Sequence, residues 1–280
     1  MKIYITGATG FVGSNLVRYY SQRGHDVRVH RREDDLKSNL ESFAPDAIIN
    51  SAAEIYDYEY MFEPNILMVQ TCLEYVHRSE QWCRMIQIGS SSEYGPTDHA
   101  TAEDTLLKPV DFYQATKGAA TLLCQGWARL HNLPIWIVRP YSVYGPGERP
   151  HRLFPRLYRA FKHGEPMTLY QGYHDFIYIN DFVRGIDLVL QEWDVAPGEI
   201  VNFGSGMQTG NFELLEIWER ITKQTAPVAK VAELKKAFEN NIWVCDTTKA
   251  AALGFTCEYD LDMGIRDFLN KANYNDITNN

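Results

Sequence analysis

The segment Gly7-Ala8-Thr9-Gly10-Phe11-Val12-Gly13 decides the fold of this chain. It follows residues 2–5, a β-branched and aromatic run typical of a strand, and leads into helical apolar spacing at Leu16, Val17 and Tyr20. Gly7 permits a tight turn, Gly10 lets backbone approach a pyrophosphate, and Gly13 lets the helix pack on the strand. The alternative is an ordinary glycine-rich turn. The strand–turn–helix setting favours a dinucleotide cradle made by Gly7, Thr9, Gly10, Phe11, Val12 and Gly13.

Strand and helix patterns alternate outward from this segment. We expect strands over residues 2–5, 26–30, 46–50, 84–88 and 134–138, with helices over 13–23, 64–77 and 112–131. This alternation predicts an α/β fold, a doubly wound parallel (Rossmann) sheet with a smaller C-terminal substrate lobe. Residues 176–179 and 200–203 read as a return to the sheet. We therefore assign 1–142 and 176–203 to a dinucleotide-binding Rossmann domain, and 143–175 and 204–280 to a substrate-binding lobe.

Composition excludes several classes of function. The 280 residues are 45% hydrophobic and 22% charged, with a net charge of -9, which argues against nucleic acid as the main partner. The five cysteines are scattered, without a Cys-x-x-Cys pair or a metal-binding spacing, so we expect reduced thiols and no metal. The chain opens directly into a strand, without a signal peptide or an apolar run that could span a membrane. These features favour a cytoplasmic enzyme with no membrane partner.

The end of the second strand bears on the cofactor. An acid usually stands there to bind the ribose 2′-OH of NAD, whereas this chain has Arg31-Arg32. A guanidinium offers a bidentate fork to a 2′-phosphate, so we expect NADP rather than NAD. The alternative is that both arginines belong to a solvated turn. Asp35 and Leu36 are expected to touch the adenine edge.

Tyr113 and Lys117 are the candidate catalytic pair. They are spaced i, i+4 at a helix start and therefore share one face. An ammonium beside a phenol favours the phenolate, so Tyr113 can exchange a proton with a substrate oxygen while a hydride moves on the cofactor. Ser90 follows the apolar strand 84–88, at the carboxyl end of the sheet where ligands bind, and can hydrogen-bond the same oxygen.

Taken together, these motifs resemble the extended short-chain dehydrogenase/reductases, the NAD(P)-dependent nucleotide-sugar epimerase/dehydratase/reductase group. Ile48-Ile49-Asn50-Ser51-Ala52-Ala53, Pro64-Asn65-Ile66 and Arg139-Pro140-Tyr141-Ser142-Val143-Tyr144-Gly145-Pro146 extend the resemblance along the chain. It implies a nucleotide-sugar substrate and a homodimer that pairs helices 64–77 and 112–131 with their copies. It also implies cofactor contacts from Ala52, Ala53, Asn65, Tyr113, Lys117 and Pro140, and substrate contacts from Ser91, Ser92, Ser142, Arg149, Arg159 and His174.

Departures from the family pattern narrow the reaction. Dehydratases of this family carry an acidic pair where Ser91 and Ser92 stand, and Glu93 comes one residue later, which on a strand would point to the opposite side. The family usually has Asn at Ser142 and Arg at His174, both facing the substrate diphosphate. We therefore expect an NADP(H)-dependent 4-keto-sugar reductase with Tyr113 as proton donor. The alternatives are a nucleotide-sugar 4-epimerase and a non-catalytic dinucleotide-binding protein on the same fold.

Overall fold

A computed structural model describes residues 1–79, 82–192, 196–232 and 242–271. The chain divides into two compact units, which are described separately. Unit 1 contains residues 1–95, 103–140 and 183–203, and unit 2 contains 96–102, 141–182 and 204–280. Residues 96–102, 141–142 and 176–182, which the sequence assigns to the Rossmann domain, thus fall in unit 2.

Unit 1 is built on a six-stranded sheet with the order β2-β1-β3-β4-β5-β9, and every neighbouring pair is parallel. Because β2 and β3 lie on opposite sides of β1, the strand order reverses at β1, and open α/β sheets bind ligands at such a point. This confirms the predicted doubly wound parallel sheet. The strands are β1 (Lys2–Thr6), β2 (Asp26–Val29), β3 (Ala47–Asn50), β4 (Arg84–Ile88), β5 (Ile135–Pro140) and β9 (Glu199–Phe203).

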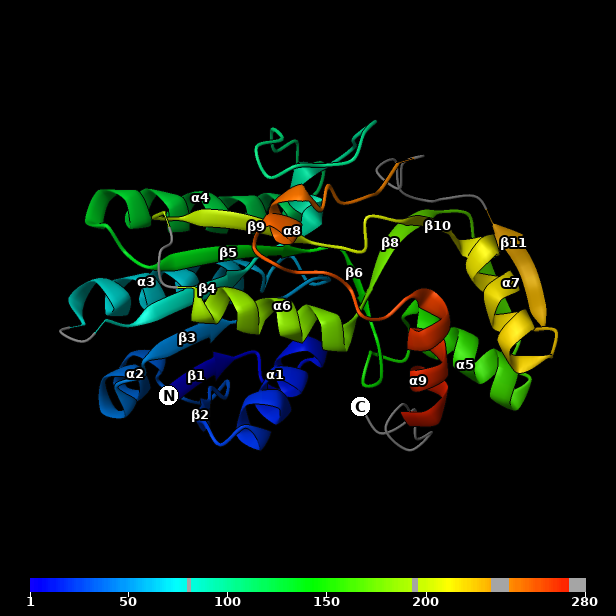
Figure 1. The fold of residues 1–280 in the computed structure, drawn as a ribbon. Helices are drawn as coiled ribbons and strands as arrows, with labels where there is room; N and C mark the ends of the chain where they lie inside the picture. Colours follow the sequence, from blue (N-terminus) through cyan, green and yellow to red (C-terminus); the bar gives the residue numbers. More distant parts are fainter. Residues whose placement is uncertain (80–81, 193–195, 233–241, 272–280) are drawn as a thin grey trace. The chain divides into compact units, whose positions relative to one another are not determined.

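Helices cover both faces of this sheet (Figure 1). On one face the core joins the strands to α2 (Leu36–Phe43), α3 (Met68–Arg78) and α4 (Phe112–His131). On the other face lie α1 (Phe11–Gln22) and α6 (Ile179–Gln191), which are linked by the Tyr19 hydroxyl donating to Asp187 at 3.0 Å. Two short helices, η1 (Glu63–Leu67) and η2 (Ser91–Tyr94), follow strand ends of the sheet. Helix α2 was not anticipated from sequence; Asp35 caps it by accepting from the Ser38 N–H at 2.7 Å.

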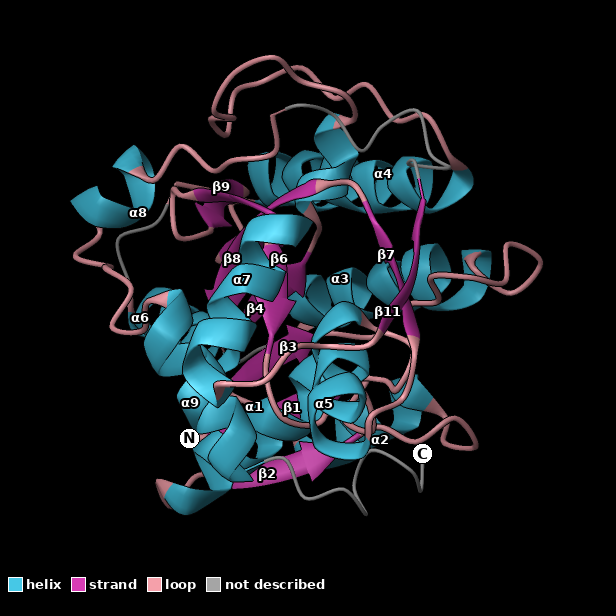
Figure 2. Cartoon of the chain, turned by 90° about the vertical axis from the view of Figure 1, so that its right-hand side faces the viewer, coloured by secondary structure: helices cyan, strands magenta, loops and turns pink. Residues whose placement is uncertain are grey.

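Unit 2 is organised around an aromatic core. Trp218 is fully buried and stacks on Phe161, with ring centroids 5.6 Å apart, and Phe154 stacks on Tyr144 at 4.1 Å. Its small sheets have the orders β10-β8-β6 and β11-β7 (Figure 2). The elements are β6 (Ser142–Tyr144), α5 (Leu153–His163), β7 (Met167–Tyr170), β8 (Tyr173–Tyr178), β10 (Gln208–Gly210), α7 (Asn211–Thr222), β11 (Val228–Ala232), α8 (Thr248–Ala252) and α9 (Leu261–Lys271).

Strand β8 corrects one expectation. Residues 176–179 were expected to rejoin the main sheet, but β8 pairs with β6 and β10 in unit 2. Residues 200–203 lie in β9, which does complete the main sheet beside β5. Both runs are apolar, and apolarity alone cannot say which sheet a strand joins. Parts of the expected lobe, residues 233–241 and 272–280, lie outside the described residues.

In the part of the chain that the structure describes, every helix is too short or too polar to cross a membrane.

Candidate active site

The glycine segment forms a tight turn between β1 and α1. Gly7 has a φ of +64°, which favours glycine, and a Cβ at Gly7 would lie 2.7 Å from the backbone of Ser51 and Ala52. A Cβ at Gly13 would meet the backbone of Gly7 and, at 2.9 Å, Ala8 Cα. Gly10 is the N-cap of α1 and offers no side-chain acceptor to the first-turn N–H groups. This cradle therefore fits the pyrophosphate of a dinucleotide.

The loop after β2 carries the two arginines. Arg31 and Arg32 are both exposed. Asp34 accepts the backbone N–H of Arg31 at 2.9 Å, and Asp35 caps α2. Leu36, the first residue of α2, packs against the core. Exposed Glu33 follows the two arginines directly, so the strand tip carries both charges, with the arginines nearer its end.

A chain of buried amides and hydroxyls runs along the carboxyl edge of the sheet. Thr6 Oγ1 donates to Asn50 Oδ1 at 2.5 Å, and Asn50 Nδ2 donates to Gln87 Oε1 at 2.7 Å. Gln87 Nε2 donates to the Ile88 carbonyl at 3.1 Å, and Ala52 N–H donates to Thr6 Oγ1 at 3.2 Å. These contacts tie the ends of β1, β3 and β4 together. The sequence does not reveal these roles of Thr6 and Gln87, because their bonds to Asn50 span 44 and 37 residues.

Asn65 lies in η1 and is buried. Its Nδ2 donates to Thr116 Oγ1 at 2.9 Å and to the Glu54 carbonyl at 3.0 Å, while its Oδ1 accepts the Glu54 N–H at 2.9 Å. The amide therefore joins the loop after β3 to α4, beside Lys117. These hydrogen bonds give Asn65 a structural role between the two segments, and the cofactor contact that the family resemblance implies stays a prediction.

Tyr113 and Lys117 lie on the first turns of α4, which is capped by Asp111 accepting from the Gln114 N–H at 2.8 Å. Lys117 is buried, and its ammonium donates to the Ile88 carbonyl at 2.5 Å, one residue before the Gly89–Ser90 loop. Burial lowers the pKa of Lys117 to about 8, while the Glu93 carboxylate acts in the opposite direction. Tyr113 is half-buried. The structure thus places the ammonium between the catalytic helix and the end of β4.

Ser90 lies at the end of β4 and caps η2. Its Oγ accepts the Ser92 N–H at 3.2 Å and lies 2.7 Å from Ser92 Oγ, whereas Ser91 is buried. Residues 91–94 form a 3₁₀ helix, so the strand geometry considered for Glu93 does not apply. The Ser90 and Glu93 side chains make a capping box, in which Glu93 Oε1 accepts the Ser90 N–H at 2.8 Å. The Ser-x-x-Glu spacing could have revealed this turn.

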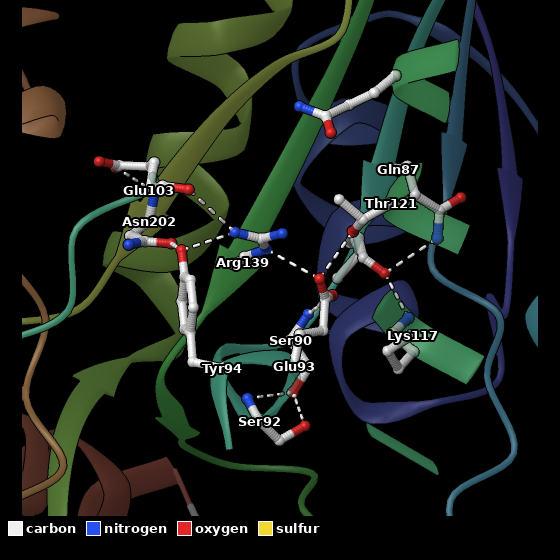
Figure 3. A network of polar contacts seen from close by, with 12 residues as sticks. Gln87, Ser90, Ser92, Glu93, Tyr94, Glu103, Lys117, Thr121, Arg139 and Asn202 are labelled. Carbon is white, nitrogen blue, oxygen red and sulfur yellow. Dashed lines mark hydrogen bonds and ion pairs between the residues drawn. The ribbon is translucent and has the colours of Figure 1, made fainter. Parts of the chain in front are cut away.

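Glu93 belongs to a buried ionic network that sequence analysis missed (Figure 3). Its Oε2 accepts Arg139 Nε at 2.9 Å and Thr121 Oγ1 at 2.8 Å. Arg139 Nη1 donates to the Tyr94 hydroxyl at 2.8 Å, and that hydroxyl donates to Asn202 Oδ1 at 2.8 Å. Glu93 is fully buried and Arg139 is 2% exposed, so neither presents its charge to solvent.

The candidate substrate residues of unit 2 fall into two groups. Ser142 Oγ and His174 Nδ1 lie 3.1 Å apart on the paired strands β6 and β8, and burial lowers the pKa of His174 to about 4, so its imidazole is neutral near pH 7. Arg159 on α5 pairs with Glu165 at 3.0 Å, and Arg149 is exposed in the loop before that helix. Among the described residues, no cluster of His, Cys, Asp and Glu side chains could hold a metal ion.

Comparisons with known proteins show the family of this chain. The model of the NAD-dependent epimerase/dehydratase family matches residues 3–204. The low-salt glycan biosynthesis protein Agl12 of Haloferax volcanii is 30% identical, covering 95% of this chain and 96% of the relative. The uncharacterized UDP-glucose epimerase YtcB of Bacillus subtilis is 28% identical over 96% of both chains. A dTDP-glucose 4,6-dehydratase of Streptomyces griseus is 24% identical over 94% of this chain and 91% of its own.

Solved structures extend the agreement to the fold. UDP-glucuronic acid 4-epimerase from Bacillus cereus, in complex with UDP-glucuronic acid and NAD, has a TM-score of 0.85 and 25% identity, covering 97% of this chain and 98% of that one. Together with the glycine cradle and the Tyr113–Lys117 pair, the family match settles the class of the protein. The chain belongs to the NAD-dependent epimerase/dehydratase family and is an NAD(P)-dependent enzyme of the extended short-chain dehydrogenase/reductase type.

Proposed function

We propose that this enzyme is an NADP(H)-dependent reductase that acts on the C4 carbonyl of a keto-sugar attached to a nucleotide. The observation that carries the proposal is the placement of Lys117, which is buried one turn from Tyr113 and bonded to the Ile88 carbonyl beside Ser90. This arrangement supports a phenol that exchanges a proton at the end of the sheet where a dinucleotide is bound. In this proposal unit 1 holds the dinucleotide.

The side chains divide the work in the following way. The first turn of α1 and the Gly7–Gly10 turn hold the pyrophosphate, and the bound dinucleotide supplies the hydride. Ser90 Oγ hydrogen-bonds the substrate oxygen and orients it toward Tyr113. The Tyr113 hydroxyl gives that oxygen a proton during reduction. The Lys117 ammonium stabilises the phenolate that this transfer leaves behind.

The cofactor preference rests on Arg31 and Arg32. Both side chains are exposed, and the carboxylates of Asp34 and Asp35 already accept backbone N–H groups. A 2′-phosphate near this strand tip would therefore meet two guanidinium groups, each able to bind it through two parallel hydrogen bonds. This supports NADP over NAD.

Reduction is favoured over dehydration by the residues around Ser90. Dehydration needs an acid for the leaving hydroxyl and a base beside the ketone. The two positions after Ser90 hold hydroxyls, and the nearby carboxylate of Glu93 is turned into the buried pair with Arg139. The proposed substrate contacts from Ser142, His174, Arg149 and Arg159 would act on the nucleotide part, with His174 neutral.

We expect the purified protein to oxidise NADPH in the presence of an NDP-4-keto-6-deoxy-sugar, and to form no 4-keto product from an NDP-hexose. The assay follows NADPH absorbance and identifies the sugar by mass spectrometry. A 4-keto-6-deoxy-sugar formed from an unmodified NDP-hexose would show a dehydratase instead. Tight NADPH binding without turnover of any keto-sugar would indicate a binding protein.

A 4-epimerase is the second candidate, because the B. cereus structure is a 4-epimerase and the B. subtilis relative bears an epimerase name. An epimerase oxidises and re-reduces the same carbon, so it interconverts two NDP-sugars without net consumption of cofactor. The same assay separates the two candidates, since only the reductase needs stoichiometric NADPH.

We also propose a homodimer that pairs α3 and α4 with their copies. Three leucines of α4 support it: Leu122 is 61% exposed, Leu130 is 77% exposed and Leu123 is 36% exposed, whereas Trp127 packs partly against the core. We expect a dimer in sedimentation at micromolar concentration, and a shift toward monomer in Leu122→Glu/Leu130→Glu. A wild-type monomer under these conditions would contradict the proposal.

A further inference from the structure

Glu93 lies in a space that the chain keeps open for it. The loop from β4 to η2 begins at Gly89, and a Cβ there would lie 2.5 Å from Glu93 Oε1 and 3.3 Å from Arg139 Cγ. Gly89 is not one of the described glycines with a positive φ. Its backbone conformation therefore does not require glycine, and what matters here is the space left by the absent side chain. The missing side chain at Gly89 thus lets the Glu93 carboxylate reach back to the Ser90 N–H.

The partners of Glu93 indicate that it is ionised. The Ser90 N–H and the Arg139 Nε–H can only donate, and both donate to its carboxylate, at 2.8 and 2.9 Å. Burial raises the pKa of Glu93, and the Arg139 guanidinium acts against that shift. The hydrogen-bond geometry therefore fits the carboxylate, with the nearly buried guanidinium at 2.9 Å as its ionic partner.

The same carboxylate faces the catalytic helix. Its Oε2 accepts from Thr121, which stands four residues after Lys117 on α4 and therefore on the same face. Glu93 on η2 and Cys124 on α4 act on the Lys117 ammonium. Arg139 on β5 pairs with Glu93, Cys72 of α3 acts on Cys124, and Tyr113 precedes Lys117 by four residues on α4. Burial raises the pKa of both thiols, that of Cys72 to about 12, so they are neutral near pH 7. Asn65 of η1, whose amide donates to Thr116, is uncharged.

We infer that Glu93 is a positioning residue of this active site: held by Arg139 and Thr121, it fixes the backbone of Ser90 and keeps Lys117 in its ammonium form. The inference rests on the proposed proton transfer through Tyr113. It adds the negative charge that keeps Lys117 able to support that transfer. Lys117 lies in a buried site where the ammonium is disfavoured, and the Glu93 carboxylate is the negative group that offsets this. Without that carboxylate, the buried Lys117 ammonium and the Arg139 guanidinium would each lose a negative group that acts on them.

The test is a titration of the Lys117 ammonium that needs no substrate. The full chain is prepared with isotope-labelled lysine, and nuclear magnetic resonance follows the Lys117 signal, which is identified by its absence from Lys117→Met. We expect a midpoint near pH 8 in the wild type, consistent with a pKa of about 8. In Glu93→Gln we expect the midpoint to fall by about one pH unit or more. An unchanged midpoint in folded Glu93→Gln overturns the inference.

Glu103→Gln is the matched charge control. The Glu103 carboxylate accepts the Asn202 N–H at 2.8 Å, and its carbonyl accepts from Arg139, so it belongs to the same network without contacting Thr121 or Ser90. We expect a smaller shift of the Lys117 midpoint than in Glu93→Gln. Equal shifts in the two variants would contradict a specific role for Glu93.

Glu93→Asp separates charge from reach, and it decides the matter if Glu93→Gln does not fold. The shorter side chain keeps the charge beside Arg139 but no longer reaches the Ser90 N–H. We expect the Lys117 midpoint to stay near pH 8 and kcat for the keto-sugar to fall about tenfold, with KM little changed. The inference is overturned if kcat of Glu93→Asp equals that of the wild type. It is also overturned if the Lys117 midpoint in Glu93→Asp is displaced as far as in a variant that removes the charge. If the midpoint moves in Glu93→Gln but no keto-sugar is reduced, the proposed function fails and this inference stands.

Discussion

Replacement of Tyr113 by phenylalanine is expected to lower kcat by about 100- to 10,000-fold, the range for a lost general acid. The aromatic ring stays, and only the hydroxyl that is proposed to transfer the proton is removed. Dinucleotide binding should persist, because the glycine cradle lies on β1 and α1. The measurement is steady-state turnover of the keto-sugar, with calorimetric titration of the cofactor.

Tyr75→Phe is the matched control for this change. Tyr75 is a half-buried phenol on α3 that packs beside the core, away from the glycine cradle. Losing its hydroxyl should leave kcat within about twofold of wild type. The hydroxyl takes no part in the proposed proton transfer, and removing a half-buried hydroxyl changes the free energy of unfolding little. Turnover that survives in Tyr113→Phe, or falls equally in both variants, would refute the catalytic assignment.

Exchange of the two strand-tip arginines is expected to reverse the cofactor preference. The wild-type protein should bind NADPH about 10- to 100-fold more tightly than NADH, since charge-assisted hydrogen bonds contribute about 1.5–3 kcal/mol each. Arg31→Asp/Arg32→Gly removes both guanidinium groups and adds a carboxylate that repels a 2′-phosphate and can accept from a ribose hydroxyl. Calorimetry with both cofactors measures the ratio of the two dissociation constants.

Arg78→Gln is the control for the loss of an arginine charge away from the strand tip. Arg78 is exposed at the end of α3 and pairs with Glu74 at 3.6 Å, so its loss removes a positive charge without altering the strand tip. It should leave the NADPH/NADH ratio unchanged. A clear preference of the wild type for NADH would overturn the NADP assignment, and would fit the NAD found in the structure of the B. cereus 4-epimerase.

The features read correctly from sequence are those with local causes. The Gly7–Gly13 turn could be recognised because close backbone approach at Gly7 and Gly13 requires the absence of a Cβ, whatever the rest of the fold does. The pairing of Tyr113 with Lys117 on one face follows from the 3.6-residue period of α4. The parallel sheet of unit 1 follows in the same way from alternating short apolar runs and amphipathic helices.

What the sequence could not show concerns segments whose partners are distant in the chain. Residues 176–179 are as apolar as a strand of the main sheet, yet β8 pairs with β6 and β10. The sequence does not reveal that the Asn65 amide bonds Glu54 and Thr116. Whether Glu93 lies on a strand or in a turn was open, and the 3₁₀ turn with its capping box directs the carboxylate to buried partners.

The sequence by itself determined the class of enzyme, since the cradle, the helix-borne Tyr113 and Lys117 and the strand–helix alternation all follow from local geometry. The tertiary structure alone decided the electrostatics around Lys117. The charges involved, Glu93 and Arg139, are 46 residues apart and meet only when β4, β5 and α4 pack together. A buried charge is tolerated only when folding supplies a partner that offsets its loss of hydration. Spacing along the chain does not encode which residue that partner is.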